Sequence, residues 1–263
     1  FCGIFILSVA KNKKDPELKS KKEQIQQNLS SKLGASTVLF EKNSGQYSQN
    51  FAYRFNSSNA CVDFYNDKIV FGLRKMTRAF NPEKVEEPML FDYVVWEIQL
   101  KNALPTSVIG KNTSDVSNVH YFDVNGQRIK KTVAESIFYP SVYPNIDLVF
   151  YKTEKGELKY DFILHPGAKV SDINLVYNGV DELEVSNQGK LSYKTKWGNI
   201  VEEQPYSYLA NNKKEIKIDY VVKNQSLTFS AATDIISETT VLDPIYVDWS
   251  TYFYGTGNNG FTW

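Results

Sequence analysis

The chain has 263 residues, with 30 Lys and Arg against 30 Asp and Glu, so its formal net charge at neutral pH is zero. This balance argues against the clustered positive surface that nucleic-acid binding requires, and it provides no attraction to an anionic membrane. Hydrophobic residues make up 42% and aromatic residues 14%, which indicates a packed domain rather than disorder. The 17 tyrosines and 16 phenylalanines favour strands over helices.

The chain begins with a short apolar run, residues 1–10, which is followed by the lysine-rich residues 11–36. Ten residues are too few to cross a bilayer as a helix, but Ser8-Val9-Ala10 is typical of a signal-peptidase site. We therefore expect a signal-peptide remnant at 1–10, a polar leader or weak helix at 11–36, and a secreted or cell-surface protein. The alternative is a buried first strand, because Ile4 to Val9 is β-prone.

Cysteine usage agrees with a fold that needs no covalent cross-links. Cys2 would be removed with the signal peptide, which leaves only Cys61. One cysteine cannot build a disulfide framework or a cysteine-based metal site. Cys61 lies in a strand-like run, so we expect a small buried apolar residue rather than a nucleophile.

From residue 37 onward, short β-prone runs alternate with turn residues. The first predicted half, 37–105, contains expected strands at 51–55, 61–65, 68–73 and 93–100. Asn66-Asp67 is a candidate hairpin turn, and we expect loops at 74–90 and 108–117.

The second predicted half, 118–243, has the same character. Its first strand ends at Asn125-Gly126, the strongest short turn signal in the chain. Alternation over Leu158–Leu164 places Tyr160 and Phe162 on a buried face and Asp161 on the opposite face. The further expected strands are 133–139, 146–151, 173–177, 183–185, 191–193, 200–201, 206–209, 215–222 and 227–230. The pattern predicts an all-β, antiparallel, sandwich-like fold with two packed halves and little helix.

Several runs resemble, in the same order, the uncharacterised N-terminal domain of secreted Bacteroidetes proteins that carry SBBP (seven-bladed β-propeller) repeats. Phe40–Tyr47 is similar to that domain's opening F-x-x-N-x-G-Q segment. The other similar runs are Tyr143–Tyr151 (YPGIDLVFY in the family), Leu158–Ala168, Gly198–Tyr206 and Leu242–Gly260. Asn145 stands where the family usually has Gly, and His120–Arg128 lacks the usual GND loop.

This resemblance, which covers residues 38–263, implies the first domain of a large exported protein. Such proteins often use the type IX secretion system of gliding bacteria and carry Ig-like or adhesin-type modules. Residues 244–263 would then begin a downstream β-repeat. Because the first unit of a repeat array needs a cap, we expect the domain to pack on a β-propeller through partly exposed Trp249, Tyr252 and Phe253.

The partners that the resemblance implies are downstream β-propeller or Ig-like domains of the same chain. An extracellular glycan or protein is a further candidate, whereas nucleic acid and stable membrane insertion are not expected.

The sequence contains no motif of a familiar active site. His120 and His165 lie far apart in the sequence, and no Gly-x-Ser-x-Gly motif is present, so we expect no catalytic residue, metal or cofactor. Asn125-Gly126 and residues 255–259 contain too few acids for a calcium loop.

Two alternatives to a non-catalytic structural or interaction domain remain open. A glycoside hydrolase needs two facing carboxylates, and the candidates are Asp147, Asp161, Glu202, Glu203 and Asp243. Alternation points Asp147 and Asp161 away from the core, and Asp243-Pro244 is typical of a turn start. A carbohydrate-binding module would need exposed aromatics, for which a core role is the favoured interpretation; they are Trp96, Trp197, Tyr206, Tyr208, Trp249 and Tyr252.

Overall fold

The computed structural model describes residues 39–57, 60–78, 90–123, 125–154 and 158–244. The predicted signal-peptide remnant, the leader and residues 245–263 lie outside this part of the chain. The described residues form strands joined by turns, with one short 3-10 helix, η1 (Val170–Asp172). The predicted all-β class is confirmed. None of these residues belongs to a helix with the length and apolar character of a membrane span.

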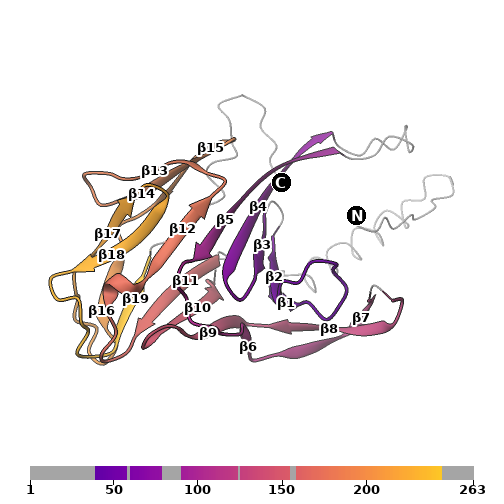
Figure 1. Cartoon of the computed structure of the whole chain (residues 1–263). Coiled ribbons are helices and arrows are strands. Elements are labelled where there is room, and N and C mark those ends of the chain that lie inside the picture. The colour runs from indigo at the N-terminus through magenta and orange to yellow at the C-terminus, as the bar shows by residue number, and fades with distance from the viewer. Residues whose placement is uncertain (1–38, 58–59, 79–89, 124, 155–157, 245–263) are drawn as a thin grey trace, which may run out of the picture. The chain divides into compact units, whose positions relative to one another are not determined.

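Three antiparallel sheets contain the strands (Figure 1). The large sheet has the order β17 (Ile218–Lys223), β18 (Ser226–Ala231), β12 (Asn174–Asn178), β5 (Leu90–Leu100), β4 (Lys68–Arg78), β3 (Ala60–Phe64), β2 (Tyr53–Asn56), β1 (Phe40–Lys42), β8 (Arg128–Ala134), β7 (Ser114–Phe122). The second sheet has the order β16 (Tyr206–Leu209), β19 (Thr240–Asp243), β11 (Leu158–Leu164), β10 (Ile146–Lys152), β9 (Ser136–Tyr143), β6 (Ile109–Lys111). The third sheet contains β13 (Asp181–Val185), β14 (Leu191–Thr195) and β15 (Gly198–Glu202).

The large and second sheets pack face to face, as in a sandwich. Strand alternation sends every second side chain inward, and these side chains join one continuous hydrophobic core. The ring centroids of Phe64 in the large sheet and Phe150 in the second sheet lie 4.9 Å apart, and those of Phe162 and Phe229 lie 6.1 Å apart. Aromatic contacts of this kind stabilise the pairing of the two sheets beyond simple area burial.

The two predicted halves share this core and the large sheet. β5, from the first half, pairs antiparallel with β12, from the second half, so that Leu100 lies opposite Leu175. β1 pairs in the same way with β8, with Phe40 opposite Ala134. The strands of residues 37–105 are therefore hydrogen-bonded on both sides to strands of residues 118–243.

The two predicted turns are confirmed, whereas both predicted loops are partly wrong. Tyr65 N–H donates to Lys68 O at 2.9 Å, and Gly126 adopts a φ of +80°. β4 continues to Arg78 and β5 begins at Leu90, while β6 and β7 occupy most of 109–122. These segments are rich in polar residues, which suit strands with solvent on one side or at a sheet edge.

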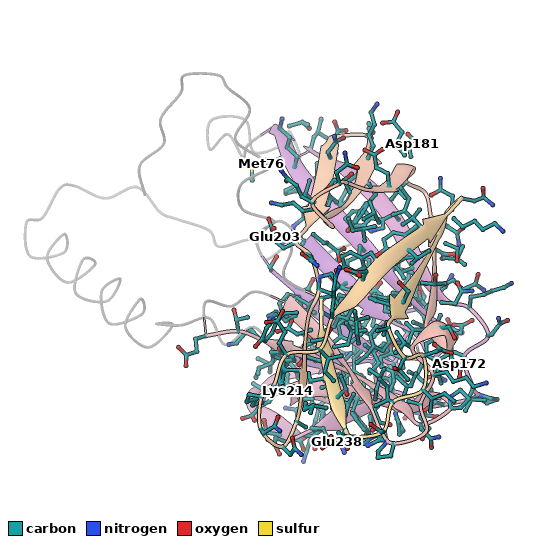
Figure 2. All side chains as sticks on the ribbon, turned by 90° about the vertical axis from the view of Figure 1, so that its left-hand side faces the viewer. Met76, Asp172, Asp181, Glu203, Lys214 and Glu238 are labelled. Atoms are coloured by element: carbon teal, nitrogen blue, oxygen red, sulfur yellow. The ribbon has the colours of Figure 1, made fainter. Side chains whose placement is uncertain are left out.

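Two more differences concern strand boundaries. The expected strand at 133–139 is divided at Glu135 between β8 and β9, and the short strands β1 and β19 were not predicted. Many side chains that face away from the core are polar or charged, and Figure 2 shows Asp181, Glu203, Lys214 and Glu238 at the periphery. Some large apolar side chains, Met76 and Phe122 among them, are exposed as well.

Removing a ring from the inter-sheet core should be far more costly than removing one from the surface. Phe162 is fully buried, whereas Phe122 is 66% exposed. We expect Phe162→Ala to lower the free energy of unfolding by about 3–5 kcal/mol and the matched Phe122→Ala to change it by less than about 0.5 kcal/mol. Urea unfolding followed by circular dichroism measures both, and equal losses would contradict the described packing.

Candidate functional site

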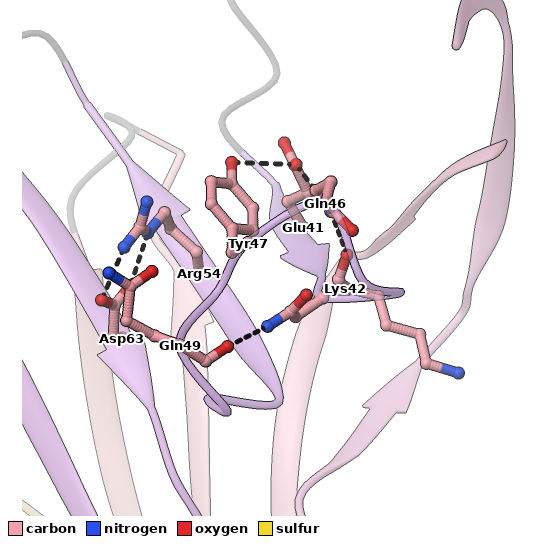
Figure 3. Close-up of polar contacts among 8 residues, drawn as sticks. Glu41, Lys42, Gln46, Tyr47, Gln49, Arg54 and Asp63 are labelled. Carbon is pink, nitrogen blue, oxygen red and sulfur yellow. Dashed lines mark hydrogen bonds and ion pairs between the residues drawn. The ribbon is translucent and has the colours of Figure 1, made fainter. Parts of the chain in front are cut away.

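The loop between β1 and β2 folds back on the outer face of the large sheet and is tied by its own side chains (Figure 3). Asn43 Nδ2 donates to Gln49 O at 2.7 Å, and Asn43 Oδ1 accepts from Gly45 N at 3.0 Å. Gln46 Nε2 donates to Lys42 O at 2.7 Å. Gly45 has a φ of +108°, which favours glycine. The Asn, Gly and Gln of the resembling F-x-x-N-x-G-Q motif therefore shape this loop.

Beneath the loop, Glu41 is a buried carboxylate with a full set of partners. Its side chain is 7% exposed, and Lys131 Nζ lies 2.9 Å from its Oε2. Tyr47 Oη and Gln46 Nε2 each donate to Glu41 Oε1 at 3.1 Å. Burial, followed by the Glu41 charge, raises the pKa of Tyr47 well above its usual range, so the phenol stays neutral. The negative charge is thus neutralised inside the fold.

Arg54 is held on the same face by charge and by aromatic stacking. Its Nε and Nη2 donate to the two carboxylate oxygens of Asp63 at 2.5 and 2.7 Å. The guanidinium carbon lies 4.5 Å from the ring centroids of both Tyr47 and Phe51. A planar guanidinium fits both contacts at once, which a lysine ammonium cannot do. This arrangement fastens the loop to β2 and β3.

A different kind of polar centre lies on the outer face of the second sheet. Phe162 pairs with Leu242, so the next position on each strand places Asp161 beside Asp243. Lys159 Nζ lies 2.9 Å from both oxygens of Asp243, and Tyr151 Oη donates to Asp161 Oδ1 at 3.2 Å. Burial and then the neighbouring Asp243 raise the pKa of Asp161 to about 6.

This acid pair, Asp161 with Asp243, is unusual in a sheet, because like charges opposite each other on neighbouring strands repel and destabilise the pairing. Lys159 compensates one of the two carboxylates, and proton uptake by Asp161 relieves the remaining repulsion. The pair lies beside Tyr206, which is 39% exposed and occupies the position opposite Asp243 on β16. The outer face therefore presents hydrogen-bonding carboxyls next to an aromatic ring.

Asp147, the other predicted acid on this face, belongs to a separate contact. Its Oδ2 lies 2.8 Å from His165 Nε2, and its Oδ1 accepts from Ser141 N at 2.7 Å. These bonds join the ends of β9, β10 and β11. The structure therefore pairs Asp161 with Asp243 rather than with Asp147. Asp243 is the last residue of β19 and binds Lys159, and the turn expected to start there would extend into residues outside the described part of the chain.

The consecutive acids Glu202 and Glu203 have opposite environments. Glu203 is exposed and accepts from Lys190 Nζ at 2.6 Å, whereas Glu202 is 3% exposed. Burial raises the pKa of Glu202 to about 7 and outweighs the nearby Tyr193 and Tyr160 phenols, which act to lower it. The burial of Glu202 can be inferred from the sequence, because strand alternation places Glu202 on the same face as Ile200.

The remaining predicted residues have varied positions. Trp96 is buried and stacks on Phe71, Trp197 packs partly against the core, and Tyr208 is half-buried. Cys61 is half-buried rather than fully buried, because it lies on the outer face of β3 beside Gly72.

His120 lies in β7 opposite Lys130. Trp249, Tyr252 and Phe253, the expected interaction surface, lie outside the described residues. Within the described ranges, no three His, Cys, Asp or Glu side chains gather into a group that could hold a metal ion.

The fold and these polar centres define an antiparallel all-β domain with a single core. Residues 40–245 match the family described as a domain of unknown function, DUF7948. The match covers most of the chain, which therefore belongs to this family. No curated protein and no solved structure matches the chain.

The stacked ion pair of Arg54 gives a stability prediction. Arg54→Lys keeps the charge but loses the bidentate geometry and the stacking on Tyr47 and Phe51. We expect a loss of about 1–3 kcal/mol in the free energy of unfolding, measured by urea titration. The exposed Arg128, changed to Lys, is the matched control and should stay close to the parent chain. A neutral Arg54→Lys would show that the stacked pair does not hold the loop.

The acid pair gives a titration prediction. Because its pKa is raised in the fold, Asp161 adds most to stability when protonated, and this contribution is lost as pH rises towards 6. In Asp243→Asn the repelling charge is gone and Lys159 is released, so the pKa of Asp161 should fall below about 6. Carboxyl NMR titration measures this. Asp181→Asn, on a different sheet, should leave Asp161 unchanged; an unshifted Asp161 in Asp243→Asn would refute the coupling.

Proposed function

We propose that the chain is a non-catalytic structural and interaction domain that caps β-repeats encoded after it. The observation that supports this best is the position of β19. This last described strand lies inside the second sheet, between β16 and β11, rather than at its edge. The chain therefore continues after Asp243 from the middle of a sheet, and Pro244, the next residue, is buried. A following domain would begin directly against the outer face of this sheet.

That outer face has the composition of a surface that another domain could cover. Strand alternation places Val149, Ile163 and Val241 on it, each half-buried. Tyr206 and Tyr208 extend the apolar strip along β16, with ring centroids 5.4 Å apart. The predicted contact residues Trp249, Tyr252 and Phe253 follow shortly after β19 in the sequence, so aromatic contacts with this strip would bury apolar area on both partners.

The polar centres support a structural role. The Glu41, Asp63 and Asp147 carboxylates are each held by partners within the fold. The large aromatic side chains inside the sandwich hold the sheets together. A catalytic role would instead be favoured by acids converging on a cleft. The open hollow beside Leu100 and Pro140 carries Asp67 but no histidine, and its other lining residues are Asn66, Asn102, Ala103, Leu104, Pro105, Thr106 and Ser107.

The resemblance to the domain that precedes SBBP repeats supports two further parts of the proposal. The protein would be exported, by way of the apolar run at residues 1–10, and it would act at the cell surface or outside the cell as an adhesin-like assembly. Its partners would be β-propeller or Ig-like domains of the same polypeptide.

The proposal requires β-repeats encoded after Trp263, so comparing this chain with the longer protein that would contain them tests the capping role. Tyr206 is 39% exposed in the chain alone, so tetranitromethane should nitrate it there and should nitrate it several-fold more slowly in the longer protein. Tyr93, 57% exposed on β5 of the large sheet, is the matched control and should react equally in both. Equal nitration of Tyr206 in the two proteins, or a coding sequence without β-repeats after Trp263, would reject the proposal.

Carbohydrate binding is the second candidate, favoured by the row that Asp161, Asp243 and Tyr206 form across β11, β19 and β16. Sugars bind to exposed rings by stacking and to carboxylates by hydrogen bonds. A glycan array probed with the chain and with its Tyr206→Ala variant tests this. Binding that disappears in Tyr206→Ala would establish the carbohydrate role, and an array without any signal would remove it. Hydrolysis of a glycan that depends on Asp161 would contradict the non-catalytic proposal.

A further inference from the structure

Apart from its chain connections to β12 and β16, the third sheet is attached to the rest of the described fold by side-chain packing. Within the described residues, none of β13, β14 and β15 shares a backbone ladder with either of the other sheets. The attachment depends on inward side chains, of which Leu183, Leu191, Tyr193 and Ile200 are buried and belong to the common core. A sheet held in this way can separate locally without breaking the ladders of its neighbours.

Glu202, at the end of β15, occupies the junction of all three sheets. The phenols of Tyr160, from β11 of the second sheet, and of Tyr193, from β14 of its own sheet, lie close enough to lower its pKa. Tyr177 from β12 and Tyr220 from β17, both in the large sheet, lie close enough for its charge to act on their phenols. The Tyr160, Tyr177 and Tyr220 hydroxyls are buried without a hydrogen-bond partner.

No positive charge balances this carboxyl among the described residues. The groups that act on Glu202 are the phenols of Tyr160 and Tyr193, and burial has raised the pKa of all four surrounding tyrosines well above the usual range, so they remain neutral. Asp243 of the second sheet also acts on one of these tyrosines, Tyr220, and raises its pKa. Glu41 and Asp63, by contrast, each face a cation.

We propose that Glu202 is a proton-controlled latch: its neutral carboxylic acid keeps the third sheet docked, and its ionised form loosens that sheet from the sandwich. A buried carboxylate without a cation is strongly unfavourable, and opening the sheet returns the charge to water. The protonated acid donates one hydrogen bond and accepts others, which suits a site lined with phenol oxygens.

The sign of the effect follows from proton linkage. The pKa of Glu202 is about 7 in the closed fold and about 4.5 when the side chain is exposed. The closed state therefore binds the proton more tightly, and the opening equilibrium increases as pH rises from about 4.5 to about 7. Above this window the closed state is also ionised, and the dependence levels off.

Hydrogen exchange of the full chain at about pH 5 and pH 8, corrected for intrinsic rates, tests the latch. The opening constant of amides in β13–β15 should rise on the order of 50-fold, while amides of β3 and β4 should change much less. In Glu202→Gln, a neutral residue of nearly equal shape, the pH dependence of β13–β15 should disappear. Glu203→Gln, the exposed neighbour, should keep it.

If Glu202→Gln does not fold, hydrogen exchange of the wild-type chain at the two pH values still tests the proposal. A pH effect that is much larger in β13–β15 than in β3 and β4 supports the latch. An equal effect in all strands, or none, overturns it, as does a pH dependence that persists in Glu202→Gln.

Discussion

The packing of the large sheet on the second sheet is the interaction on which the rest of the structure depends. Phe64, Phe150, Phe162 and Phe229 meet across the interface and join the strands of both sheets into one core. Because the large sheet contains strands from both predicted halves, neither half can bury its apolar face without the other. The β1–β2 loop and the acid pair lie on the outer faces of these two sheets, and the third sheet packs its inward side chains into their common core.

The charged groups fall into two classes that follow from their distance to this core. On the outer faces, Glu41, Asp63 and Asp243 meet lysine or arginine, and their charges stay compensated. Inside the core, where none of the described residues places a cation beside it, Glu202 is stabilised in its neutral form instead. The stability of the fold therefore differs between acidic and neutral pH, through Glu202 in the third sheet and through Asp161 in the second sheet.

Much of the fold could be predicted from the sequence because strand alternation is local. The alternation in Leu158–Leu164 correctly assigned both faces of β11, and Asn125-Gly126 correctly marked a turn. β6 and the outer part of β4 could not be found in this way, since polar side chains at edges and on solvent faces resemble loop residues. The acid pair depends on β19 joining β11 across a long sequence separation, which no local pattern reveals.

The central claim is that residues 39–78 and 90–123 cannot fold apart from residues 125–244, because they share one core. Urea unfolding followed by residue-resolved NMR tests it most directly, with β3 reporting on the first predicted half and β10 on the second. The account predicts coincident midpoints for the two strands at a fixed pH. Separate midpoints, with one half still folded after the other has unfolded, would contradict it.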